Sequence, residues 1–95
     1  MAFDLIIENG LVVDGTGKPG VNTSVGINGT KITAIGDLSD AEAAKRIDAS
    51  GHVVSPGFID THAHADGALL IDGQHAEGIR QGVTTEIVGP DGLTY

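Results

Sequence analysis

The chain has 95 residues, 40% of them hydrophobic, which is enough for a folded domain with a modest core and argues against disorder. Its formal charge of −8, with only five basic residues, argues against a nucleic-acid partner and against attachment to anionic membranes. The sequence has no cysteine and therefore predicts no thiolate metal site. It has no apparent secretion signal and no apolar run of the roughly 20 residues that span a bilayer, so it predicts a cytoplasmic protein.

The first part of the chain has the pattern of short β-strands separated by glycine-containing turns. Residues 4–13 contain two apolar runs on either side of Asn9-Gly10, a pair that favours a hairpin turn. A second such pair, Asn28-Gly29, predicts another hairpin between strands at residues 25–27 and 31–35.

The next stretch is polar and rich in alanine. Ser39 and Glu42 match a capping box, so we predict a short helical turn there. Residues 47–49 and 53–54 are then predicted to be strands. Residues 1–55 should therefore form an all-β unit of about five short strands.

The pattern changes at Pro56. Residues 58–64 are predicted to form a buried strand that is followed by a polar break at Asp66-Gly67. Apolar and small residues at helical spacing predict a helix over residues 71–80, and the β-branched residues 83–88 predict the next strand. This strand, helix and strand have the length of a βαβ unit with parallel strands.

Two histidines end the first strand of that unit. His62 and His64 are two residues apart, so on extended backbone their side chains share a face with Cα atoms roughly 7 Å apart, and both can bind one metal ion. Asp91 follows the second strand and should lie on the same rim, as a further candidate ligand. Asp60 shares the face of the two histidines and either orients a ligand or is an ordinary hydrogen-bonded strand residue. Spacing alone leaves open that the histidines are solvated loop residues.

Two further titratable residues are interpreted as structural. His75 lies on the predicted helix, away from the strand ends, so we expect a surface or packed histidine. Glu86 alternates with its neighbours in a predicted buried strand, and we favour a carboxylate with a structural hydrogen-bond partner over one that points into a barrel interior.

The run PGFIDTHAH at residues 56–64 resembles the first-strand signature of the amidohydrolase superfamily. Residues 4–10 and 31–36 are similar to the amino-terminal β-sandwich strands of those enzymes. Residues 81–85, followed by a Gly-x-x-Gly turn, narrow the resemblance to the D-aminoacylases, or N-acyl-D-amino-acid deacylases. The resemblance extends over essentially the whole chain.

This resemblance implies a mixed α/β fold in which residues 1–55 are part of a β-sandwich and residues 56–95 begin the catalytic (β/α)₈ barrel with its first βαβ unit. It implies hydrolysis of the amide of an N-acyl-D-amino acid, with His62 and His64 as ligands of zinc or another divalent metal ion. Asp91 stands where several D-aminoacylases have a metal-binding cysteine. The remaining ligands and the general base are expected beyond Tyr95.

A single parallel strand pair leaves an open edge and an uncovered apolar face. We therefore expect these residues to be a piece that pairs with the remainder of a barrel or with another chain, and to be inactive alone. A self-contained α+β domain is the structural alternative. The functional alternatives are a cyclic-amide hydrolase, similar to dihydroorotase or hydantoinase, and a non-catalytic β module whose histidines are incidental.

Overall fold

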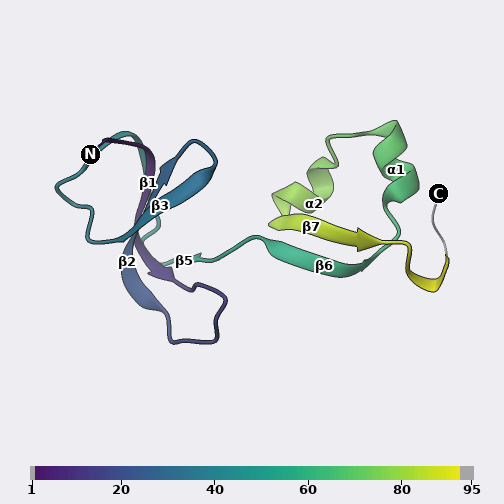
Figure 1. Cartoon of the computed structure of the whole chain (residues 1–95), viewed down its shortest axis with the longest axis horizontal. Helices are drawn as coiled ribbons and strands as arrows, with labels where there is room; N and C mark the ends of the chain where they lie inside the picture. The colour runs from purple at the N-terminus through teal and green to yellow at the C-terminus, as the bar shows by residue number, and fades with distance from the viewer. Residues whose placement is uncertain (1, 93–95) are drawn as a thin grey trace. The chain divides into compact units, whose positions relative to one another are not determined.

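The structure, a computed structural model, describes residues 2–92. The chain divides into two compact units, Met1–Pro56 and Gly57–Tyr95. Strands predominate over helices in the described residues (Figure 1). No helix within residues 2–92 is long and apolar enough to cross a membrane.

The first unit is a five-stranded sheet built around one long strand, which pairs with three others. The strands are β1 (Ala2–Val12), β2 (Val21–Asn28), β3 (Lys31–Gly36), β4 (Glu42–Asp48) and β5 (Val53–Val54). Their order is β3-β2-β1-β4, and β5 pairs with the end of β1. The hairpins are antiparallel, whereas β4 and β5 run parallel to β1. The prediction of an all-β unit of about five strands is confirmed.

The predicted hairpin at Asn9-Gly10 is wrong, because β1 continues through this pair. Asn9 has a φ of 63°, and three steps of β1 from Ile7 to Gly10 span two steps of β2, which defines a β-bulge. The Asn9 side-chain amide donates a hydrogen bond of 3.0 Å to the carboxylate of Asp48. The left-handed conformation that lets Asn-Gly reverse a chain thus lets it form a bulge here. The hairpin predicted at Asn28-Gly29 is confirmed, with β2 pairing antiparallel to β3.

The helical turn predicted from Ser39 and Glu42 is also wrong. The backbone N–H and the hydroxyl of Ser39 donate hydrogen bonds of 3.0 and 2.7 Å to Asp37, so this serine closes a turn and does not cap a helix. Glu42 begins β4, which pairs with β1 from Ala2 to Glu8. Ladder hydrogen bonds and packing against β1 outweigh the local capping signal.

The core of this unit is small and consists mainly of side chains from β1 and β2. Ile6 is fully buried, and Phe3 and Val25 are each 5% exposed. A Cβ on Gly26 would lie 2.5 Å from the Phe3 ring, so glycine lets that ring pack directly on the backbone of β2. Burial of each large side chain contributes roughly 1.5–3 kcal/mol.

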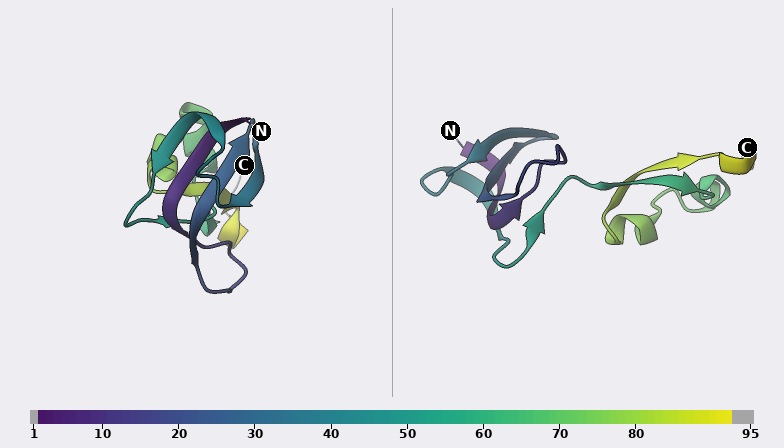
Figure 2. Two further views of the ribbon diagram at one scale, coloured as in Figure 1. Left: turned by 90° about the vertical axis from the view of Figure 1, so that its left-hand side faces the viewer. Right: turned by 90° about the horizontal axis from the view of Figure 1, so that it is seen from below.

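The second unit is a parallel βαβ arrangement. It contains β6 (Phe58–Ala63), α1 (Asp66–Ile71), α2 (Ala76–Arg80), β7 (Val83–Val88) and the 3₁₀ turn η1 (Pro90–Gly92). The strands β6 and β7 pair parallel, as predicted, and the two short helices form the connection between them (Figure 2). Phe58, Ile59 and Ile87 are 60%, 62% and 54% exposed, which agrees with the expectation of an uncovered apolar surface. The prediction that these strands are buried is wrong for the described residues, because a single strand pair with two short helices does not cover their apolar side chains.

The predicted continuous helix over residues 71–80 is interrupted, and its first part begins earlier than expected. The Asp66-Gly67 pair, predicted to be a break, begins α1. The Asp72 carboxylate accepts a 3.1 Å hydrogen bond from the backbone N–H of Gln74, and His75 has a φ of 45°. The aspartate turn and the following glycine compete with helical hydrogen bonding at this point, so the helix stops and restarts as α2.

Candidate metal centre

His62 in β6 and His64, which directly follows the end of this strand, project to the same side, as their spacing predicts. Ala63, between them, is buried at 7% exposure, while both imidazole rings are solvent-accessible. The Nε2 atoms of His62 and His64 are 3.3 Å apart, and the rings meet at an interplanar angle of 70°. The strand therefore aims one nitrogen of each ring at a common point.

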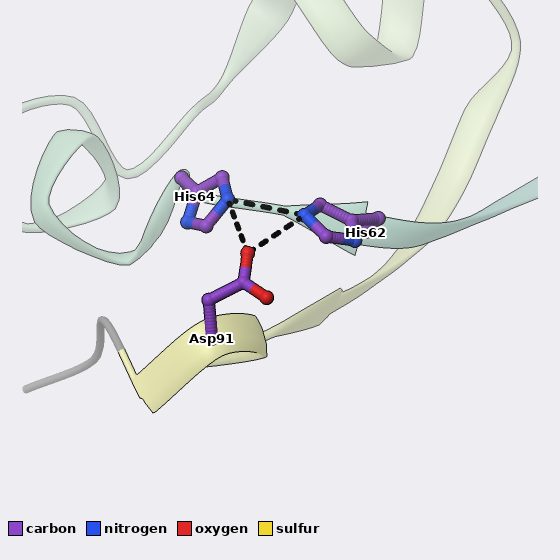
Figure 3. Close-up of side chains that lie close together, drawn as sticks. All are labelled: His62, His64 and Asp91. Carbon is purple, nitrogen blue, oxygen red and sulfur yellow. Dashed lines mark hydrogen bonds and ion pairs between the residues drawn. The ribbon is translucent and has the colours of Figure 1, made fainter.

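Asp91 brings a carboxylate to the same point from the turn after β7 (Figure 3). Its Oδ2 lies 3.3 Å from Nε2 of His62 and 3.9 Å from Nε2 of His64. Asp91 has a φ of 58°, a conformation that aspartate tolerates better than most residues. Gly89 and Gly92 on either side also have positive φ values, so this turn bends sharply enough to direct the carboxylate back over β6.

The three side chains have the chemistry and the spacing of a divalent-metal site. Their ligand atoms all lie within 4.8 Å of one another. Ligands held about 2.1 Å from a tetrahedral ion are roughly 3.4 Å apart. Two of the three observed separations match this value, and the third, between His64 and Asp91, exceeds it by about half an ångström. Two imidazoles and a carboxylate are a donor set that suits Zn²⁺ and similar ions.

Asp60 precedes this cluster on β6, but its side chain forms a hydrogen bond with the backbone. Its Oδ1 accepts a 3.1 Å hydrogen bond from the backbone N–H of His62. Within the described residues, no hydrogen bond joins Asp60 to an imidazole ring. The sequence left open whether Asp60 orients a ligand or is an ordinary hydrogen-bonded strand residue, and its observed contact with the backbone fits the second role.

The pairing of β6 with β7 is irregular in two places. Thr84 is an extra residue on β7, because Phe58 pairs with Val83 and Ile59 pairs with Thr85. The Thr84 side chain lies directly over Gly57, at the start of β6. Sequence reasoning missed this close contact, for which glycine before a strand is at most a weak signal.

His75 and Glu86 form a pair outside the cluster. Their Nε2 and Oε1 atoms are 2.8 Å apart, and both side chains are partly buried. The hydrogen bond to Glu86 raises the pKa of His75 above its ordinary value, and desolvation opposes this only in part. The interpretation of both residues as structural agrees with this contact between the start of α2 and β7.

Comparisons of the sequence and of the structure with known proteins point to the same group of enzymes. The model of the amidohydrolase family matches residues 45–94. The D-aminoacylase of Alcaligenes xylosoxydans xylosoxydans is 48% identical over 92 residues, which are 97% of this chain and 19% of that enzyme. A structure of D-aminoacylase with a binuclear metal centre superposes with a TM-score of 0.86 at 50% identity, covering 92% of this chain and 18% of the enzyme.

A third relative is the N-acyl-D-glutamate deacylase of Bordetella bronchiseptica, solved with zinc and a phosphonate inhibitor that mimics the tetrahedral intermediate. It superposes with a TM-score of 0.91 at 37% identity, covering 99% of this chain and 20% of the enzyme. The chain thus spans about a fifth of the length of these relatives. Since the family model covers more than half of its residues, the chain belongs to the amidohydrolase family.

Proposed function

We propose that the protein is a metal-dependent hydrolase that cleaves the amide bond of N-acyl-D-amino acids, releasing a carboxylate and a free D-amino acid. The observation that carries this proposal is the convergence of His62, His64 and Asp91 after two parallel strands. The similarity to D-aminoacylase and to N-acyl-D-glutamate deacylase supports the choice of substrate class.

The place of the cluster in the fold supports a barrel enzyme. Active sites of (β/α)₈ barrels are built at the carboxyl ends of the strands, and the three ligand atoms lie at that end of β6 and β7. In this proposal residues 56–95 begin the barrel and residues 1–55 contribute to a β-sandwich. The exposed apolar side chains of β6 and β7 would pack against the remainder of the barrel.

His62 and His64 would hold the metal ion through their Nε2 atoms, each as a neutral imidazole. Asp91 would add one negative charge and a hard oxygen ligand. Zinc or another divalent ion supplies Lewis acidity, which polarises an amide carbonyl and promotes ionisation of water near neutral pH. Because the Asp91 carboxylate is a hard oxygen ligand, this site should accept harder ions more readily than a site with a thiolate in its place would.

The test uses the full-length protein purified without chelators, with bound metal measured by elemental analysis. We expect stoichiometric divalent metal and hydrolysis of N-acetyl-D-amino acids but not of their L-enantiomers. His62→Ala should weaken metal binding by more than the roughly 10- to 100-fold typical of changes outside the ligand set. His52→Ala is the matched control, because His52 lies in the first unit and its ring contacts the Ser50 carbonyl.

Two results would contradict the proposal. Far less than stoichiometric metal, unchanged by His62→Ala, would remove the metal centre and favour a non-catalytic module. Hydrolysis of dihydroorotate or hydantoins in place of N-acyl-D-amino acids would keep the metal centre but assign the protein to the cyclic-amide hydrolases.

A further inference from the structure

We propose that Asp60 is a positioning residue that directs the His62 ring by fixing the backbone at a β-bulge, without touching the ring. This inference rests on the proposed metal centre and adds a residue that acts on one of its ligands. The contact that carries it is the 3.1 Å hydrogen bond from the backbone N–H of His62 to Oδ1 of Asp60.

The bulge is visible in the pairing of the two strands. Asp60 pairs with Glu86 and Ala63 pairs with Val88, so three steps on β6 span only two steps on β7. A regular ladder would place His62 opposite Val88. The bulge puts the buried Ala63 there, which leaves the histidines on either side of it free to turn toward Asp91.

A bulge interrupts the ladder hydrogen bonds, and backbone groups within it need other partners. The Asp60 carboxylate supplies an acceptor for the N–H of His62 two residues further along the chain. This bond restrains the backbone torsions on both sides of the His62 N–H. Those torsions set the direction of the Cα–Cβ bond and therefore the position of the ring.

The same local bond occurs elsewhere in the chain, which provides a control. Asp72 accepts a hydrogen bond from the N–H of Gln74 at 3.1 Å, in the connection between α1 and α2. This bond has the same length and the same spacing in the same unit, but Asp72 is not part of the metal cluster. Removing either carboxylate costs the unit one charge and one local hydrogen bond, and only one of them should affect the metal.

If Asp60 acts as a hydrogen-bond acceptor for the backbone, its variants should behave differently than if it acts through its negative charge. Asparagine at position 60 keeps an acceptor oxygen at the same distance from the chain but carries no charge. Glutamate keeps the charge but moves the carboxylate one methylene further out. If the acceptor position matters, Asp60→Asn should resemble the wild type, and Asp60→Ala and Asp60→Glu should not.

The experiment measures Zn²⁺ affinity of the full-length protein by competition with a chromophoric chelator, and the absorption spectrum of the Co²⁺-loaded form. We expect Asp60→Ala and Asp60→Glu to weaken Zn²⁺ binding by about tenfold or more and to alter the Co²⁺ spectrum. Asp60→Asn and Asp72→Ala should retain the wild-type affinity and spectrum. Should Asp60→Ala fail to fold, the comparison of Asp60→Asn with Asp60→Glu decides the question.

Wild-type affinity in Asp60→Ala or Asp60→Glu would overturn the inference. So would an Asp60→Asn variant as weak as Asp60→Ala, because it would show that the charge is required. Each of these results leaves the metal centre itself intact, since wild-type binding and its loss in His62→Ala are measured alongside. Absence of metal binding by the wild type would instead overturn the proposed function and this inference together.

Discussion

Substituting Gly57 by alanine should disrupt the strand pairing that brings the candidate metal ligands together. A Cβ at this position would lie 2.7 Å from the Cβ of Thr84, and its Oγ1 and Cγ2 would be closer still. Carbon atoms pack at about 3.5–4.0 Å, so roughly 1 Å of separation is missing. Rotating the Thr84 side chain cannot relieve the contact, because its Cβ is fixed to the backbone. The start of β6 must therefore move away from β7.

The cost follows from this geometry. Overpacking in a well-packed site typically costs 1–3 kcal/mol, and a clash that only backbone movement relieves belongs to the upper part of this range, about 2–3 kcal/mol. The loss should be local, at the backbone hydrogen bond of 2.8 Å from the Phe58 N–H to the Gly82 carbonyl. Native-state hydrogen exchange at the Phe58 amide measures this loss of local stability, because a loss of about 2–3 kcal/mol accelerates exchange through local opening by roughly 30- to 150-fold.

Two variants make the result specific. Gly73→Ala is the control, since the nearest atom to its added Cβ is 3.9 Å away, an ordinary contact. Adding Thr84→Gly to Gly57→Ala removes the clashing side chain and should restore most of the lost protection. If Gly57→Ala protects the Phe58 amide as well as Gly73→Ala does, or if the double variant is no better than Gly57→Ala, the steric reasoning is refuted.

The other predictions concern pH and metal preference. Because its hydrogen bond to Glu86 raises the pKa of His75 above 6.5, this pair stabilises the fold fully below about pH 6.5 and loses that contribution as pH rises through the raised pKa. The denaturation midpoint should therefore fall with rising pH more steeply in the wild type than in Glu86→Gln, and parallel curves would contradict the assignment. Asp91→Cys should raise the ratio of Zn²⁺ to Mn²⁺ affinity by about tenfold or more, because thiolate favours softer ions. An unchanged ratio in a competition assay would show that Asp91 does not bind the ion.

The elements that the sequence predicts well are those whose local pattern and tertiary environment agree. The hairpin at Asn28-Gly29 and the strands β6 and β7 have apolar β-formers bounded by turn residues, and they pair as expected. Where the structure departs from prediction, a distant partner decides. Asn9-Gly10 has the residues of a hairpin, but Gly10 and its successors find pairing partners in β2 and β5, so the pair becomes a bulge.

The same reasoning explains why the predicted helical turn after Ser39 is a strand. An exposed capping box contributes only about 1 kcal/mol, whereas β4 gains a ladder of backbone hydrogen bonds by lying beside β1. That pairing joins residues about 40 positions apart, from Ala2 with Glu42 to Glu8 with Asp48. A local pattern holds no information about a partner so far along the chain.

The candidate site shows a similar division between what the motif predicts and what the fold adds. The spacing of His62 and His64 predicts one shared face, and the position of Asp91 after the next parallel strand predicts that the three residues meet. Neither predicts the bulge, which decides whether His62 or Ala63 stands opposite Val88. Strict alternation from Asp60 would have placed His62 opposite Val88, the position that Ala63 takes.

A local signal for the bulge does exist in the sequence. Aspartate readily accepts a hydrogen bond from the backbone N–H two residues further on, and in this chain it does so mainly at turns and next to glycine or serine. Asp60-x-His62 repeats that spacing inside a run of β-formers, where such a bond competes with the ladder. The informative unit is therefore Asp60-x-His62-x-His64 and not the histidine pair alone. Asp60 stands where β6 departs from regular pairing with β7, and in our proposal this departure sets the direction of the histidine side chains.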